Sequence, residues 1–161
     1  MDPITAIYTP GTNTWRSIGA DPVGRNYHST SVLLPDGRVA VMGTNPADNS
    51  FDFRISVYSP PYLFQGERPK IVQAPDAAGH GDALELEVDG DVVSASLMAP
   101  MSSTHQTDTN ARLIDLPMAG AGNTRTVQVP DNPNLVPPGP YMLTVLDTDG
   151  VPSEAEWVWV S

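Results

Sequence analysis

Short apolar runs, each ended by a proline or a glycine, constrain the fold of this chain more than any other feature of its sequence. Apolar and polar residues alternate within the runs, as in Ala83–Val88 and Glu156–Val160. A period of two is typical of half-buried strands. Seventeen prolines and thirteen glycines divide the 161 residues, and no stretch has a convincing helical pattern. The sequence therefore predicts an all-β fold with many short strands.

Residues 1–66 predict strand-and-turn units with a tyrosine or tryptophan at their ends. The turn Pro35-Asp36-Gly37 lies between two apolar runs, and Asp-Gly at such a place is a strong hairpin signal. Repeats of this kind are typical of kelch-type β-propeller blades. A closed propeller needs at least about four blades, and only one or two fit here. We therefore expect the closing strands of a partial propeller. The expected strands are 6–8, 29–34, 38–42 and 55–58.

Residues 67–161 predict a second domain, an immunoglobulin-like (early-set) β-sandwich. About seven short strands at regular spacing over about ninety residues are typical of this fold. The chain has no cysteine, so the sandwich lacks the disulfide of antibody domains, and thiol catalysis and zinc–thiolate sites are excluded. The expected strands are 70–73, 83–88, 92–98, 112–116, 125–129, 141–147 and 155–160.

Charge and hydropathy exclude several partners. The net charge is −11 with only eight basic residues, which argues against a nucleic-acid or anionic-membrane surface. No apolar run is long enough to cross a bilayer. The first residues, Met1-Asp2-Pro3, lack the basic and apolar segments of a signal peptide.

Three side chains suit a copper ion. Tyr27 and His28 are adjacent, and His105 lies in a loop rich in serine and threonine. Imidazole nitrogen and phenolate oxygen are ligands that Cu(II) accepts in tetragonal geometry. Asp108 is a candidate acceptor for an imidazole N–H, which would orient a ligand histidine, or else a solvated loop carboxylate. His80, between two glycines, is expected to be a solvent-facing turn residue.

The chain resembles the C-terminal part of the galactose oxidase and glyoxal oxidase family of copper-radical oxidases. The resemblance rests on motifs that occur in the family's order over nearly the whole chain. They are Arg25-Asn26-Tyr27-His28-Ser29, Leu33-Leu34-Pro35-Asp36-Gly37-Arg38-Val39, Tyr58-Ser59-Pro60-Pro61-Tyr62-Leu63-Phe64, Arg68-Pro69, Thr104-His105, Pro140-Tyr141-Met142-Leu143 and Gly150-Val151-Pro152-Ser153. In that family a kelch propeller carries the copper, and the immunoglobulin-like domain contributes one histidine loop.

The resemblance implies a role for each candidate. Tyr27 matches the axial tyrosine, a copper ligand that also acts as the base toward the alcohol proton, and His28 and His105 match the two imidazole ligands. The family's remaining ligand is a tyrosine crosslinked to a cysteine, which stores a radical. Without cysteine this chain cannot form that cofactor by itself. Arg25 and Arg54 are expected either near a substrate or at the surface.

The predicted function is therefore the C-terminal portion of an oxidase that converts a primary alcohol or aldehyde with O₂ and releases hydrogen peroxide. The substrate would be a small alcohol, an aldehyde or a sugar, and the resemblance implies a secreted or extracellular protein. Two alternatives stay open. The chain could be a non-catalytic module associated with carbohydrate or a cell surface, or one subunit of a split assembly in which another chain supplies the missing blades.

Overall fold

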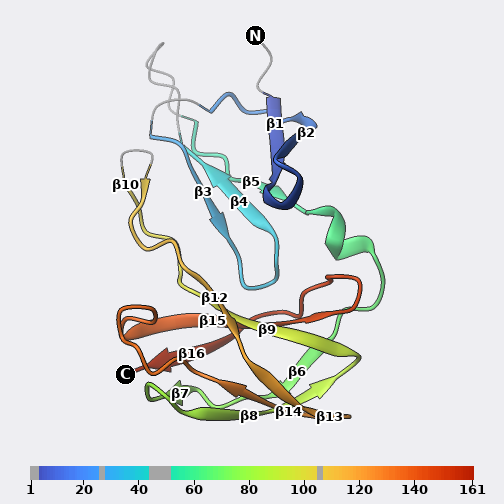
Figure 1. Ribbon diagram of the computed structural model, residues 1–161. Coiled ribbons are helices and arrows are strands. Elements are labelled where there is room, and N and C mark those ends of the chain that lie inside the picture. The colour runs from blue at the N-terminus through green and yellow to red at the C-terminus, as the bar shows by residue number, and fades with distance from the viewer. Residues whose placement is uncertain (1–3, 26–27, 44–51, 105–106) are drawn as a thin grey trace. The chain divides into compact units, whose positions relative to one another are not determined.

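The computed structural model describes residues 4–25, 28–43, 52–104 and 107–161, and nearly all of its regular structure is β-strand (Figure 1). The all-β prediction is thus confirmed. The chain divides into two compact units. Unit 1 comprises residues 1–32 and 40–58, and unit 2 comprises residues 33–39 and 59–161. In the described residues, no helix is long and apolar enough to cross a membrane.

Unit 1 begins with an antiparallel hairpin of β1 (Ile4–Thr9) and β2 (Thr14–Ala20), joined by the 3-10 helix η1 (Pro10–Thr12). Asn13 ends η1 in the left-handed conformation, and its side chain accepts a hydrogen bond from the Tyr8 hydroxyl. The rings of Tyr8 and Trp15 pair across the two strands with centroids 4.8 Å apart. Trp15 therefore lies within strand β2.

A three-stranded sheet in the order β3-β4-β5 completes unit 1. Its strands are β3 (Thr30–Leu33), β4 (Val39–Met42) and β5 (Ser56–Tyr58). The turn between β3 and β4, residues 33–39, groups with unit 2. In this turn the Gly37 N–H donates to the Leu34 carbonyl, and Gly37 adopts a φ of 85°, which glycine tolerates without strain. The predicted Asp-Gly turn is confirmed.

Unit 2 contains a sandwich of two sheets. The five-stranded sheet has the order β12-β9-β15-β16-β7, and the four-stranded sheet has the order β13-β14-β8-β6. Neighbouring strands pair antiparallel, except β16 and β7, which are parallel. The strands of the two sheets are β6 (Lys70–Gln73), β7 (Ala77–Ala78), β8 (Ala83–Asp89), β9 (Val92–Met98), β12 (Leu113–Leu116), β13 (Met118–Ala121), β14 (Thr124–Gln128), β15 (Gly139–Asp147) and β16 (Glu156–Val160).

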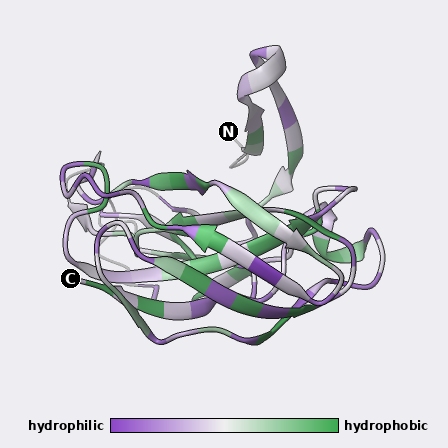
Figure 2. Ribbon diagram, turned by 60° about the horizontal axis from the view of Figure 1, so that its bottom comes forward, coloured by the Kyte–Doolittle hydropathy of each residue, from purple (hydrophilic) through white to green (hydrophobic). Residues whose placement is uncertain are grey.

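The core of unit 2 follows from the alternation in its sequence. Every second residue of β8 is buried, and Leu86 and Val88 have no exposed surface. These side chains meet Leu97, Leu143 and others from the opposite sheet in one cluster. Figure 2 shows apolar and polar residues alternating along the sandwich strands. Burying one side of each sheet is what period-two patterning provides.

Each strand predicted for the sandwich is present, with ends shifted by at most a few residues. The sequence reading missed the short strands β7 and β13, and also the small hairpin of β10 (Ser103–Thr104) and β11 (Thr107–Asp108). His80 lies in a turn, as predicted, but it is half-buried instead of solvent-facing, and its Nε2 lies 2.7 Å from the Val136 carbonyl oxygen.

Candidate metal centre

Two of the three predicted copper ligands, Tyr27 and His105, lie outside the described residues, which omit 26–27 and 105–106. The structure therefore places only His28 and the candidate orienting residue Asp108. His28 belongs to unit 1, whereas Asp108 belongs to unit 2. Among the described residues no group of three or more His, Cys, Asp or Glu side chains could hold a metal ion.

His28 is exposed and stands two residues before β3, with a left-handed φ of 54°. A non-glycine residue rarely adopts this conformation, although histidine is enriched there. Gly43, directly after β4, approaches this backbone closely. A Cβ atom on Gly43 would lie 2.4 Å from the Ser29 Cα and 2.9 Å from the His28 carbonyl oxygen. Only glycine permits this approach, so the left-handed turn at His28 and Gly43 are structurally linked.

A buried arginine supports the same loop. The Arg25 side chain is 8% exposed and that of Asp21 is 12% exposed, with Arg25 Nε 3.3 Å from Asp21 Oδ2. Arg25 Nη1 donates to the Gly43 carbonyl and Nη2 to Ser56 Oγ, both at 2.9 Å. The Ser56 hydroxyl in turn donates to Asp21 Oδ1 at 2.8 Å. We call these four residues, Asp21, Arg25, Gly43 and Ser56, the Arg25 cluster.

The carboxylate of Asp21 is stabilised in its charged form within this cluster. Burial by itself would raise the pKa of Asp21, but hydrogen bonds from the Val23 N–H, the Ser56 hydroxyl and the Arg25 guanidinium together lower it below 3.8. An ionised Asp21 opposite an ionised Arg25 is therefore the state expected at neutral pH. Arg25 is thus committed to protein partners, in contrast to the surface or substrate role expected from the sequence.

Asp108 braces the loop in which His105 stands in sequence. Its Oδ1 accepts hydrogen bonds from the Ser102 N–H and the Asn110 N–H, both at 2.9 Å. The Thr109 N–H donates to the Ser102 carbonyl at 3.0 Å, across the base of the β10–β11 hairpin. Asp108 therefore fixes the hairpin base through backbone groups. That it also accepts an imidazole N–H remains a prediction.

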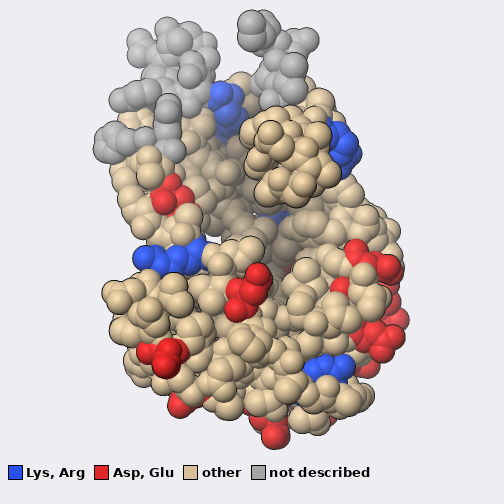
Figure 3. Space-filling model, in the orientation of Figure 1, with Lys and Arg blue, Asp and Glu red and all other residues tan. Residues whose placement is uncertain are grey.

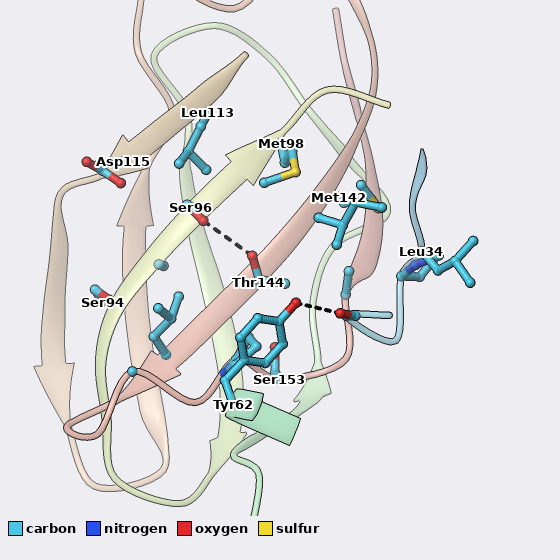
Figure 4. A pocket seen from close by; sticks show the side chains of 18 residues that line it. Leu34, Tyr62, Ser94, Ser96, Met98, Leu113, Asp115, Met142, Thr144 and Ser153 are labelled. Carbon is cyan, nitrogen blue, oxygen red and sulfur yellow. Dashed lines mark hydrogen bonds between the residues drawn. The ribbon is translucent and has the colours of Figure 1, made fainter. Parts of the chain in front are cut away.

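A cavity of about 380 Å³ lies in unit 2 between the 33–37 turn, Tyr62 and the outer face of the five-stranded sheet (Figure 4). Its wall is mostly apolar and includes Met98, Leu113 and Met142, with the Ser96 and Thr144 hydroxyls hydrogen-bonded to each other at 3.2 Å. The Tyr62 hydroxyl donates to the Gly37 carbonyl. The lining holds one carboxylate, that of Asp115, so the cavity suits an apolar group and offers no metal-ligand set.

Acidic side chains outnumber basic ones on the face of the sandwich that Figure 3 shows. This agrees with the net charge of −11. Through long-range electrostatics, the negative surface of this unit attracts cations more than anions. It does not by itself identify a site.

The structure defines a class of protein, a two-sheet β-sandwich preceded in the chain by short strand units, with the imidazole of His28 just before one of these strands. Residues 68–160 match the galactose oxidase-like, early set domain family. The chain belongs to this family.

Relatives and solved structures agree with this assignment. A galactose oxidase of Gibberella zeae is 33% identical over 166 residues, covering 96% of this chain and 24% of the relative. The aldehyde oxidase GLOX1 of Arabidopsis thaliana is 30% identical, covering 91% of this chain and 28% of the relative. A fungal alcohol oxidase of the AA5 family, solved in complex with copper, superposes with a TM-score of 0.89 at 27% identity, covering 98% of this chain and 36% of that one. The chain spans about a quarter of the length of these curated relatives.

The sequence did not predict the hydrogen-bond partners of Arg25 or of Arg68. Arg68 is the first residue of the family match, and its guanidinium donates to the carbonyls of Asp36, Pro152 and Ser153 at 2.7–2.8 Å. These partners are 32, 84 and 85 residues away in sequence. No local pattern signals a contact to a distant backbone carbonyl.

Proposed function

We propose that this chain is the C-terminal portion of a copper-radical oxidase that oxidises a primary alcohol or aldehyde with O₂ and releases hydrogen peroxide. The observation that carries the proposal is the likeness over 98% of the chain to an alcohol oxidase solved with copper. The likeness to a galactose oxidase and to an aldehyde oxidase over more than nine tenths of the chain supports it.

In this proposal residues 1–66 are closing strands of a kelch-like propeller, and residues 67–161 are the sandwich domain. Tyr27, His28 and His105 hold the copper. The donor set fits, because Cu(II) favours imidazole and oxygen ligands. The chain's own residues bind the metal through two imidazoles, and the Tyr27 phenolate oxygen accepts the proton of the alcohol as a general base.

Bound copper and a radical tyrosine would together supply the two one-electron oxidations that an alcohol requires. The crosslinked tyrosine of the family needs a cysteine, and none occurs among these 161 residues. We therefore expect little turnover from this chain alone. The second candidate is a non-catalytic module associated with carbohydrate or a cell surface, or one subunit of a split assembly in which another chain supplies the missing blades and the radical tyrosine.

Substrates in this proposal are a small alcohol, an aldehyde or a sugar, with O₂ as the oxidant, and the site of action is extracellular. The relatives named galactose oxidase and aldehyde oxidase support this substrate range. Neither nucleic acid nor membrane is a proposed partner.

A Cu(II) titration by calorimetry, followed by EPR of the loaded protein, tests the proposal. We expect one site with nitrogen hyperfine structure, and His28→Ala or His105→Ala should each weaken Cu(II) affinity by more than about 100-fold because a direct ligand is lost. The control is His80→Gln, which changes the one other histidine of the chain. Copper affinity that is equal in wild type, His28→Ala and His105→Ala would refute the proposed ligands.

A further inference from the structure

We propose that Arg25 is a positioning residue for the proposed copper centre, acting on His28 through the backbone of Gly43. The inference rests on the proposed function, because it concerns the ligand role of His28. The proposed role concerns the Arg25 cluster, whose four residues are not part of the proposed ligand set. All of them lie in unit 1.

The backbone conformation of His28 is unusual. A left-handed φ of 54° places this residue in a sparsely populated region, and such conformations persist only where the surroundings determine them. His28 immediately precedes Ser29, and a Cβ atom built on Gly43 would collide with the backbone of both residues. A side chain at position 43 would therefore crowd the His28 turn.

Arg25 holds Gly43 in place by a hydrogen bond to its carbonyl. Its carbonyl accepts the 2.9 Å hydrogen bond from Arg25 Nη1, and a hydrogen bond from a charged donor to a part-buried acceptor is among the stronger kinds in proteins. Gly43 has a φ of 128°, a conformation that other residues avoid. Residues 44–51 follow it outside the described chain. Arg25 is therefore a specific anchor for the end of β4.

Asp21 and Ser56 in turn fix the side chain of Arg25. Asp21 and Ser56 occupy its Nε and Nη2 atoms, and the Ser56 hydroxyl closes the ring back to Asp21. The Arg25 side chain is nearly buried, which leaves little of it accessible to a substrate. A fixed arginine three residues before His28 resembles the outer hydrogen-bonding groups that orient metal ligands in other proteins.

The test compares Cu(II) affinity and the EPR spectrum of the full chain with those of Arg25→Met and Gly43→Ala. Arg25→Met removes the donors at similar length, and Gly43→Ala places a Cβ atom against Ser29. We expect each to weaken Cu(II) binding about 10- to 100-fold, the usual effect of losing an outer partner of a ligand. The matched control is Arg16→Met, an exposed arginine of β2 in the same unit.

A double variant separates positioning from general destabilisation. In a His28→Ala background the Arg25→Met change should have no further effect on Cu(II) affinity, because the ligand it positions is gone. An equal loss in both backgrounds would overturn the inference in favour of a purely structural role. The milder Asp21→Asn variant, checked by circular dichroism, provides the same comparison if Arg25→Met does not fold.

The remaining outcomes distinguish the two proposals. If wild type shows a His28-dependent copper site and Arg25→Met binds copper equally well with the same spectrum, the positioning role fails and the proposed function stands. If wild type has no His28-dependent site, the proposed ligand set fails, and the role of Arg25 fails with it.

Discussion

In unit 2 a continuous cluster of buried apolar side chains lies between two sheets, whereas in the described part of unit 1 only Val23 and Ala40 are buried. Large apolar side chains are exposed in both units, for example Trp15 and Phe53 in unit 1 and Phe64 and Leu113 in unit 2. The difference between the units is therefore the buried core and not the exposed surface. The small number of buried residues in the described part of unit 1 supports the proposal that this unit is part of a larger propeller.

Arg25 in unit 1 and Arg68 in unit 2 each have several protein partners, and the two are used differently. Arg25 pairs with the Asp21 carboxylate and, through Gly43 and Ser56, joins three segments of a unit in which few apolar side chains are buried. Arg68 donates to three backbone carbonyls of unit 2, which already has a core. Removing Arg68 should therefore have a local effect, whereas removing a core side chain should affect the whole sandwich.

The largest expected effect is that of Leu143→Ala in β15. Leu143 has no exposed surface, and truncating a buried leucine leaves a cavity that costs about 3 kcal/mol of unfolding free energy. Urea unfolding followed by the fluorescence of Trp157 and Trp159, in a Trp15→Phe background, reports on unit 2. Val23→Ala in unit 1 should cost about 1 kcal/mol, because fewer buried atoms are removed.

Leu135→Ala is the matched control for that comparison. Leu135 is 56% exposed, and its truncation should change the unfolding free energy by less than about 0.5 kcal/mol. A Leu143→Ala cost no larger than that of Leu135→Ala would contradict the assignment of the core to unit 2.

An intermediate effect is expected for Arg68→Met. Loss of three hydrogen bonds from a charged donor should cost about 2 kcal/mol, and the consequence should be confined to the 33–39 turn and the segment around Pro152 and Ser153, where the three acceptors lie. The Tyr62 hydroxyl and the Ala155 N–H still hold the turn, through the carbonyls of Gly37 and Pro35. Hydrogen exchange should therefore rise in these two segments, while β9 and the centre of β15 stay protected.

Arg38→Met is the control for Arg68. Arg38 lies in the same turn, but its ion pair with Asp36 is largely solvent-exposed, and exposed pairs contribute only about 0–1 kcal/mol. Faster exchange throughout the sandwich after Arg68→Met would show that Arg68 supports the core as well as the turn.

Sequence patterns predicted the sandwich better than the site. Alternation in β8 and β16 reports directly which residues face the core, because burial imposes a period of two. The turn at Gly37 was predictable for a similar local reason. The Arg25 cluster was not, because Asp21, Gly43 and Ser56 meet Arg25 only through loops whose course no periodicity encodes. Tyr27 and His105 could be proposed only from the family resemblance, since an isolated tyrosine or histidine carries no signal of its partners.

The smallest expected effect concerns the pH dependence of unit 1. Because the pKa of Asp21 is lowered on folding, its stabilising contribution is fully present above the unfolded value of 3.8 and is lost as the pH falls through the lower folded value. Asp21→Asn should therefore cost about 1 kcal/mol at pH 7, and the difference from wild type should shrink in acid. Thermal unfolding between pH 7 and pH 2, with Trp15 fluorescence as the probe in a Trp157→Phe/Trp159→Phe background, measures this difference.

Asp52 provides the control within the same unit. Its hydrogen bonds with Arg54 lower its pKa to about 2, yet the pair is on the surface, where solvent and salt screen the interaction. Asp52→Asn should accordingly leave unfolding at pH 7 unchanged. If the two variants behaved alike, burial of the Arg25 cluster would be irrelevant to its strength. The contrast between a unit organised by a buried polar cluster and one organised by an apolar core would then lose its physical basis.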